Sequence, residues 1–233
     1  MDIYQDLVEE LVKWSTYLSR QVSDIWAFGN ISARYKDAII IKASGVSLNE
    51  IKSTEFVLAG SGEIASDSNL SPSTDTDTHL ELYDAFPEVC AIVHTHSLYA
   101  ISWAQSGQPI PCLGTTHADY WCGEIPITRE LTTLEINGEY EKETGRAIVE
   151  TIQNIGMKST DLPGVLVARH GPFTWGTTVE QAVRHAELLE YVAKAAYITC
   201  SLNSSRELTS LSQIYLDRHF TRKHGSKAYY GQG

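Results

Sequence analysis

Two short apolar segments of the sequence each end in histidine, and this pattern constrains the fold more than any other feature. His94-Thr95-His96 follows Ala91–Val93, and His170 follows Val165–Ala168. Short apolar runs of this kind are typical of buried strands. Side chains at positions i and i+2 of a strand point to the same face, so His94 and His96 can both reach one metal ion. The sequence therefore predicts two strand ends that carry ligands of one metal site.

Asp75, in the segment Ser73-Thr74-Asp75-Thr76, completes the candidate ligand set. Zinc favours imidazole and carboxylate ligands, and a catalytic zinc site keeps one coordination position open for substrate. A His-x-His pair alone is also typical of histidines that pack in a core or face solvent. His170-Gly171-Pro172 favours the metal site, because it lies at a turn after a buried strand, where functional side chains are often displayed.

The length and charge of the chain limit its partners. At 233 residues the chain can bury a substantial core as one domain, and its 42% hydrophobic and 20% charged content is ordinary for a soluble protein. The formal net charge of -11 argues against nucleic acid and anionic membranes, because such binding needs a surface rich in lysine and arginine. An anionic small molecule would need a local positive pocket.

The cysteines and the N-terminus indicate a cytoplasmic protein. Cys90, Cys112, Cys122 and Cys200 show no Cys-x-x-Cys spacing and lie in largely apolar or aromatic surroundings, which predicts reduced, buried thiols. The N-terminal residues lack a basic region followed by an apolar stretch, and the sequence contains no apolar run of about 18 residues or more.

Hydrophobic spacing and turn residues predict an order in which helices alternate with strands. Pro87 ends one predicted helix, Gly107 closes the next, and Thr177-Thr178-Val179-Glu180 has the capping-box pattern that predicts the start of a long helix. His185 in that helix has no predicted function. The predicted helices cover residues 2–20, 76–86, 97–106, 134–154 and 177–200, and the predicted strands cover 31–35, 38–41, 56–58, 90–94 and 163–168, with a short edge segment at 173–175.

Three short polar loops could hold a phosphate or sugar hydroxyls. Gly29-Asn30, Ser44-Gly45 and Ser73-Thr74 each lie at the edge of an apolar segment and offer backbone N–H groups and small polar side chains. Each alone is equally compatible with ordinary turn chemistry. Lys42 is a candidate cation near the second loop.

The C-terminal segment is unusual in an acidic protein. Residues 218–224 form a basic cluster, and the chain ends after the adjacent tyrosines Tyr229 and Tyr230. Tyrosines are unexpected in a frayed terminus, so we expect this tail to fold over its own subunit or a neighbouring one.

Ordered sequence blocks along nearly the whole chain resemble the bacterial L-ribulose-5-phosphate 4-epimerases of the class II aldolase/epimerase superfamily. The blocks are Gly29-Asn30-Ile31-Ser32, Lys42-Ala43-Ser44-Gly45-Val46, Ile92-Val93-His94-Thr95-His96-Ser97, Gly114-Thr115-Thr116-His117-Ala118-Asp119-Tyr120, Ile136-Asn137-Gly138-Glu139-Tyr140-Glu141, Pro163-Gly164-Val165-Leu166-Val167 with His170-Gly171-Pro172-Phe173, and the tail from Lys223 to Gln232.

The resemblance implies an α/β fold, a three-layer α/β/α domain over residues 1–233 around a mixed, mostly antiparallel sheet. It implies a cyclic homotetramer in which the tail, about residues 218–233, reaches the active site of a neighbouring subunit. The implied reaction is epimerisation of L-ribulose 5-phosphate to D-xylulose 5-phosphate. By motif match, zinc would be held by Asp75, His94, His96 and His170; the substrate phosphate by Gly29, Asn30, Lys42, Ser44, Gly45, Ser73 and Thr74; Asp119 and Tyr230 would be the catalytic acid and base; and Thr116, Glu141, His219 and Arg222 would be further site residues.

Two alternatives share parts of this pattern. A class II aldolase that releases dihydroxyacetone phosphate would share the metal and the phosphate loops, but the resembling aldolases carry Glu where this chain has Asp75. A non-catalytic module of the adducin-head type would have lost metal ligands. Two residues depart from the epimerase pattern: Ala43 stands where proline is common, and Thr74 stands where serine is usual. Neither change removes a hydrogen-bond donor from the loops. The resemblance does not distinguish between arabinose and ascorbate catabolism as the pathway. It also does not determine whether the metal is zinc, manganese or cobalt.

Overall fold

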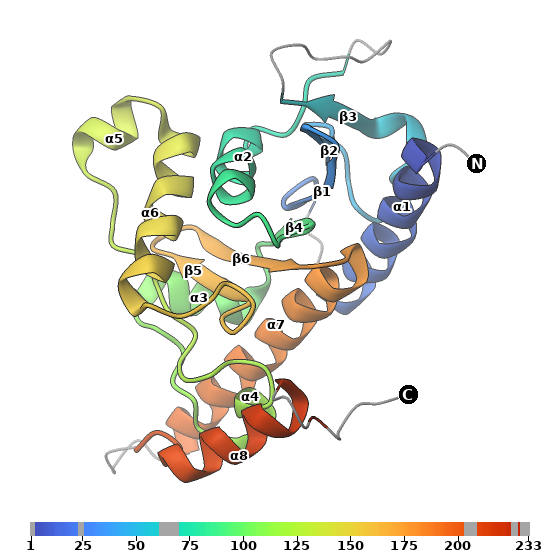
Figure 1. The fold of residues 1–233 in the computed structure, drawn as a ribbon. Coiled ribbons are helices and arrows are strands. Elements are labelled where there is room, and N and C mark those ends of the chain that lie inside the picture. The colour runs from blue at the N-terminus through green and yellow to red at the C-terminus, as the bar shows by residue number, and fades with distance from the viewer. Residues whose placement is uncertain (1–2, 23–25, 61–69, 203–208, 225–227, 229–233) are drawn as a thin grey trace.

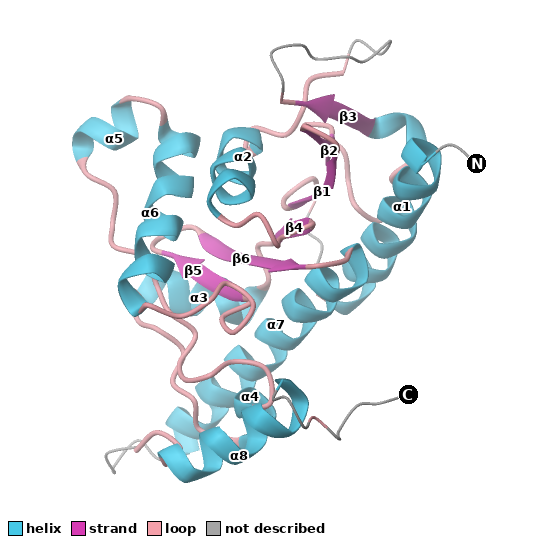
Figure 2. Cartoon of the chain, in the orientation of Figure 1, coloured by secondary structure: helices cyan, strands magenta, loops and turns pink. Residues whose placement is uncertain are grey.

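The computed structural model describes residues 3–22, 26–60, 70–202, 209–224 and 228. Within them, a six-stranded sheet has the order β3-β2-β1-β4-β6-β5 (Figures 1 and 2). Every pairing between these strands is antiparallel, and the parallel component is an isolated bridge between Ile127 and Leu166. The strands are β1 Asn30–Tyr35, β2 Ala38–Lys42, β3 Phe56–Ala59, β4 Ala91–His94, β5 Gly164–Val167 and β6 Gly171–Gly176.

Helices cover both faces of the sheet, which gives the three layers visible in Figure 1. α1 and the first half of α7 pack on one face, and α2 and α6 pack on the other. The α/β class with a mostly antiparallel sheet is therefore confirmed. The helices are α1 Ile3–Gln21, α2 Thr76–Ala85, α3 Leu98–Ser106, α4 Thr115–Ala118, α5 Thr133–Asn137, α6 Tyr140–Ile155, α7 Val179–Leu202 and α8 Gln213–His224, with a short 3-10 helix at Ser53–Glu55.

The alternation of side chains along the strands divides the core between the two faces. Ile41 and Ile92 pack in the cluster that includes α2 and α6, whereas Ile40 and Val93 pack against α1 and α7. His94, two residues after Ile92, faces the α2 side for the same reason. The strand period thus decides which layer surrounds the first candidate ligand.

Two predicted elements are wrong. The helix predicted over residues 134–154 is two helices, because Gly138 leaves helical geometry and ends α5 while α6 begins at Tyr140. Thr132 starts α5 as a separate unit, since its side chain and that of Glu135 cap each other's backbone N–H groups. The segment 173–175 is not at an edge: β6 pairs with both β4 and β5, and this central position explains the burial of Phe173 and Trp175.

The prediction of buried thiols is only partly correct. All four cysteines are free; Cys112 is buried, Cys122 and Cys200 are partly buried, and Cys90 is exposed just before β4. Cys90 is at the sheet boundary, where its backbone N–H pairs with Gly176 while its side chain faces outward. None of the described helices is both long and apolar enough to cross a lipid bilayer.

The start of α3, immediately after the first histidine pair, depends on a carboxylate from α7. Glu190 accepts the backbone N–H groups of Tyr99 at 3.0 Å and Ala100 at 2.9 Å. We expect Glu190→Gln to lower the free energy of unfolding by about 1 to 2 kcal/mol, because the amide offers one neutral acceptor in place of two charged ones. Urea unfolding measures this change. Glu180→Gln, which removes an exposed pair with Arg184, is the control and should cost less than about 0.5 kcal/mol; equal losses would contradict the assignment.

His185 should make the protein less stable in acid. Burial lowers the pKa of His185 to about 4, against the opposing effect of its Nδ1–H donation to the Trp175 carbonyl. The neutral imidazole contributes its full share to the free energy of unfolding above pH 6.5, about the pKa of histidine in the unfolded chain. This contribution is lost as pH falls through 4, because the imidazole takes up a proton in the unfolded state before it does so in the folded state. Between pH 6.5 and pH 4, we expect the free energy of unfolding of the wild type to decrease by about 3 kcal/mol more than that of His185→Gln. Parallel pH profiles in urea unfolding would refute this.

Candidate metal centre

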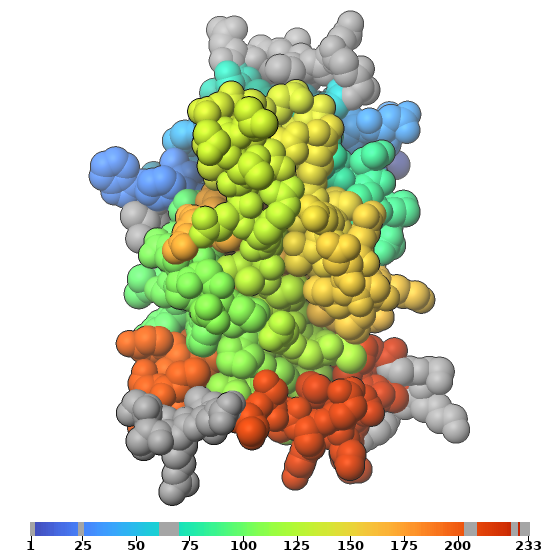
Figure 3. Space-filling view, turned by 90° about the vertical axis from the view of Figure 1, so that its left-hand side faces the viewer, coloured from blue at the N-terminus to red at the C-terminus, as the bar shows by residue number. Residues whose placement is uncertain are grey.

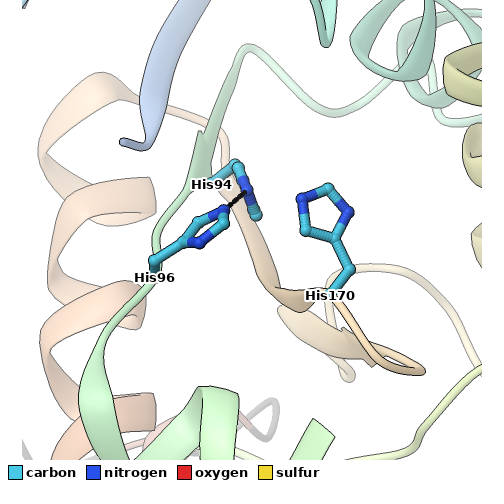
Figure 4. Close-up of side chains that lie close together, drawn as sticks. All are labelled: His94, His96 and His170. Atoms are coloured by element: carbon cyan, nitrogen blue, oxygen red, sulfur yellow. Dashed lines mark hydrogen bonds between the residues drawn. The ribbon is translucent and has the colours of Figure 1, made fainter. Parts of the chain in front are cut away.

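Three histidines from two separate segments of the chain meet at one end of the sheet (Figure 4). His94 ends β4, His96 lies two residues further, and His170 lies in the turn between β5 and β6. One ring nitrogen from each lies within 4.8 Å of the others. Such spacing suits three imidazoles around one divalent cation.

His94 is the most firmly held of the three. Its Nδ1–H donates to the carbonyl of Pro172 at 2.9 Å, and its ring stacks on buried Phe173 with 4.2 Å between ring centroids. Because Nδ1 carries the proton, Nε2 presents a lone pair toward the cluster, 3.0 Å from Nε2 of His96. This backbone bond is the kind of outer contact that fixes a ligand's tautomer.

His96 lies near His94 as predicted, but not because both residues belong to one strand. β4 ends at His94, so Thr95 and His96 lie outside the strand. The rings of His94 and His96 still lie 4.8 Å apart, edge to face, because the chain turns there toward α3. The loop, and not strand alternation, brings the second ligand to the cluster.

His170 is held by a tight turn. Arg169 has a φ of 65°, in the left-handed region, and its backbone N–H donates to the carbonyl of Ala104 at 3.0 Å. Gly171 then leaves room for the neighbouring segment, since an added Cβ would lie 2.8 Å from the Thr95 carbonyl oxygen and 3.3 Å from His94 Cε1. Nδ1 of His170 is buried and has no hydrogen-bond partner among the described residues, so no described neighbour fixes which of its ring nitrogens carries the proton.

Asp75 brings a carboxylate to the same place. It precedes the first turn of α2, and its Oδ2 lies 3.9 Å from His94 Nε2 and accepts Asn30 Nδ2 at 2.6 Å. Burial lowers the pKa of all three histidines below the ordinary 6.5, so the imidazoles are neutral at pH 7 and can donate lone pairs. The donor set therefore fits a divalent metal ion.

The three polar loops predicted from the sequence converge beside this cluster. Asn30 pairs with His94 across β1 and β4. The other two loops are joined to each other, since Ser44 N–H donates to Ser71 O and Ser73 N–H donates to Lys42 O, each at 3.0 Å. The structure thus places Gly29-Asn30, Ser44-Gly45 and Ser73-Thr74 at one end of the sheet.

Lys42 has a different environment from that expected of a phosphate cation. Its side chain is 2% exposed, and its Nζ donates to the carbonyls of Val46 at 2.5 Å and Ala43 at 3.2 Å. The ammonium group therefore holds the Ser44-Gly45 loop in shape. Any effect on a phosphate would act through this loop and through the charge.

A second cluster surrounds Asp119, at the end of α4. Arg222 donates to both carboxylate oxygens, at 3.0 Å and 2.7 Å, and His219 donates to one of them at 3.0 Å. Partial burial alone would raise the pKa of Asp119, but the hydrogen bonds from Arg222 and His219 outweigh it and hold that pKa below its ordinary value. Three of the predicted site residues, Asp119, His219 and Arg222, are therefore brought together by α4 and α8.

Within one chain the two clusters are separate. Figure 1 places α4 and α8 at one end of the molecule, away from β4 and the β5–β6 turn, and the side view in Figure 3 shows α8 at that same end. Thr116 lines a hollow beside α7 with Leu113 and Tyr191. Glu141 lies on the histidine side, where its charge acts on His170. Tyr230 lies outside the described residues.

Two aromatic residues lie at the candidate metal centre, and the sequence motifs do not assign a role to either. The Tyr140 ring lies 6.5 Å from that of His170, and burial, followed by the charges of Asp75 and Glu141, raises its pKa. Phe28 stacks on His96. Tyr140 could have been noticed as the neighbour of Glu141, but Phe28 has only its position before Gly29 as a signal.

Residues 9–197 match the family model of the class II aldolase and adducin N-terminal domain. The chain belongs to this family. Several solved structures of similar proteins share its fold. An L-fuculose 1-phosphate aldolase is 22% identical, with a TM-score of 0.77 over 92% of this chain and 94% of the other. YgbL from Klebsiella pneumoniae is 22% identical, with a TM-score of 0.71 over 92% and 98%. The L-fuculose-1-phosphate aldolase from Thermus thermophilus is 19% identical, with a TM-score of 0.70 over 88% and 100%.

Gly171 gives a direct test of the candidate metal centre. We expect Gly171→Ala to lower zinc affinity at least about ten-fold, because the added methyl group would displace the Thr95 carbonyl or the His94 ring. Competition with a chromogenic chelator measures this. Gly114→Ala is the matched control, since an added Cβ there meets nothing within 4 Å. Equal affinities of the two variants would show that this close approach does not shape the site.

Proposed function

We propose that this protein is a metal-dependent L-ribulose-5-phosphate 4-epimerase that produces D-xylulose 5-phosphate. The observation that carries the proposal is the position of Asp75. Its short carboxylate is oriented by Asn30 and lies 3.9 Å from a ligand nitrogen of His94, as expected of a fourth metal ligand. In the aldolases that this chain resembles, a glutamate at this position acts as the base, so Asp75 favours the epimerase.

The residues of the cluster would hold zinc, with manganese or cobalt as substitutes that accept the same donors. When bound, zinc would polarise the C2 carbonyl and stabilise negative charge on the C2 and C3 oxygens of the sugar. The loops Gly29-Asn30, Ser44-Gly45 and Ser73-Thr74 would hold the phosphate through backbone N–H groups and small side chains. A sugar-phosphate substrate agrees with the names of the structural neighbours.

The chemistry requires a base and an acid on opposite sides of the substrate. The hydrogen on C4 is not adjacent to the carbonyl, so deprotonation cannot invert this carbon. When a base removes the C4 hydroxyl proton, the C3–C4 bond breaks, its electron pair passes to the C2–C3 enediolate, and glycolaldehyde phosphate forms. Rotation of the anchored aldehyde and re-formation of the bond invert C4, while an acid returns the proton to the new alkoxide. We assign these two roles to Asp119 and Tyr230, with Tyr230 acting on the L-ribulose isomer.

The location of Asp119 supports an active site between subunits. α4 and α8 lie away from the histidines of their own chain, so Asp119 would meet the metal centre of a neighbour in a cyclic homotetramer. Arg222 and His219 hold its carboxylate in the ionised form, ready to accept a proton. Tyr230 follows six residues after α8 and would reach the same neighbour.

The second candidate is a class II aldolase that releases dihydroxyacetone phosphate. The fold of several L-fuculose phosphate aldolases favours it, and the metal and phosphate groups would serve both reactions. The two functions differ in the fate of the aldehyde, which an aldolase releases and an epimerase retains.

Turnover of L-ribulose 5-phosphate by zinc-loaded protein tests the proposal. We expect formation of D-xylulose 5-phosphate, its loss after chelation, and a fall in kcat of at least about 100-fold in Asp119→Asn and in Tyr230→Phe, because each variant loses a proton-transfer group. Zinc content should stay unchanged in both. Release of dihydroxyacetone phosphate from a deoxy-ketose 1-phosphate, without epimerisation, would favour the aldolase.

Mixed oligomers test the position of Asp119. Asp119→Asn and His96→Asn should each be inactive, but coexpression should restore about a quarter of wild-type activity, since random pairing leaves that share of sites with both intact halves. Two coexpressed copies of Asp119→Asn with different tags are the control. Activity no higher than that control would place Asp119 outside the shared site.

A further inference from the structure

The rings of two candidate ligands each rest on a phenylalanine, but the two contacts differ in kind. His94 stacks on Phe173, which is completely buried in the core. His96 stacks on Phe28 with 5.2 Å between centroids and 19° between ring planes, although Phe28 is 53% exposed. An aromatic side chain that leaves half of its surface in water gains little from core packing, so the stacking on His96 is its main contact with a functional group.

His96 has fewer restraints than His94. His94 is held by a strand, by the Pro172 carbonyl and by Phe173. His96 lies beyond β4, and within the described part of the chain its hydrogen bond is the 3.0 Å contact of its Nε2 with His94 Nε2. Both of these nitrogens would face a bound metal, so that contact cannot orient the ring in the loaded site. The remaining ring contacts of His96 with His94 and His170 are edge to face.

The loop that carries Phe28 is fixed against the end of β4. Gly29 has a φ of 84°, and a Cβ there would lie 2.8 Å from the carbonyl oxygen of His94. Only glycine can approach the His94 carbonyl this closely, and this contact fixes the backbone beside Phe28 relative to β4. On its other side, the buried Lys42 Nζ donates to the Ala27 carbonyl at 3.5 Å. Phe28 therefore extends from a backbone that is anchored on both sides.

We propose that Phe28 is a positioning residue that sets the ring plane of His96 for metal binding. The flat phenyl face limits rotation of the imidazole, so Nε2 stays directed at the ion although none of the described residues forms a hydrogen bond with the other ring nitrogen. Most ligand histidines are oriented by such a hydrogen bond, and here stacking takes its place. The inference rests on the metal site of the proposed function, but it does not depend on which sugar phosphate is the substrate.

Metal affinity of single variants tests this role. We expect Phe28→Leu to lower zinc affinity about ten-fold in competition with a chelator, because leucine keeps an apolar side chain and loses the flat face. Phe28→Tyr should bind within about two-fold of wild type, since it keeps the ring. In the cobalt-loaded protein, the visible ligand-field spectrum should change in Phe28→Leu and not in Phe28→Tyr. The matched control is Trp26→Leu, which removes an aromatic side chain that is 84% exposed in the same loop.

Each other result has a defined meaning. Equal zinc affinity of Phe28→Leu and wild type would overturn the inference while leaving the metal site intact. An equal loss in Phe28→Tyr or in Trp26→Leu would also overturn it, because the cause would then be the loop and not the stacked ring. A wild-type protein that binds no divalent metal would overturn the proposed function and this inference together. Affinity is measured without substrate, so failure of the epimerase assay alone leaves the inference standing.

Discussion

The antiparallel register of β4 between β1 and β6 is the constraint on which the candidate site depends. This register sets Asn30 on one side of His94 and Phe173 on the other. Asn30 then orients Asp75, and Phe173 supports the His94 ring. Because side chains change face at every residue of a strand, a shift of one position would send His94 to the α1 side of the sheet. Backbone pairing thus brings His94 and Asp75, two of the candidate ligands, together from segments far apart in sequence.

The residues proposed for catalysis form two separate groups, the histidine cluster at the end of the sheet and the Asp119 cluster between α4 and α8. The candidate metal ligands and the three polar loops lie at one end of the sheet, where backbone hydrogen bonds hold the loops. The Asp119 cluster is held by α8 at another end of the molecule. A site composed in this way would be complete only when subunits associate, which would couple activity to assembly.

Much of the fold could be predicted from local patterns, because hydrophobic period and turn chemistry act over a few residues. α1, α2, α3 and α7 follow the predicted ranges, and β6 was identified as a strand-like segment. The sequence does not predict its place in the sheet, since an apolar triplet does not show how many neighbouring strands it has. It does not predict the break at Gly138 either, because the charged helical pattern continues across it. For the site, residue chemistry indicates the four candidate ligands, whereas nothing in the local sequence assigns Phe28 a role.

The sequence by itself determined the donor chemistry of this protein: three histidines and an aspartate, small polar loops, and a basic C-terminal segment. These are properties of residue types and short spacings, which the chain carries in any conformation. Only the tertiary structure decided that His96 is placed by a loop and a stacked Phe28, that Lys42 binds backbone carbonyls, and that Asp119 pairs with Arg222. Such contacts depend on the register of the sheet and on the packing of distant helices, which local sequence does not specify.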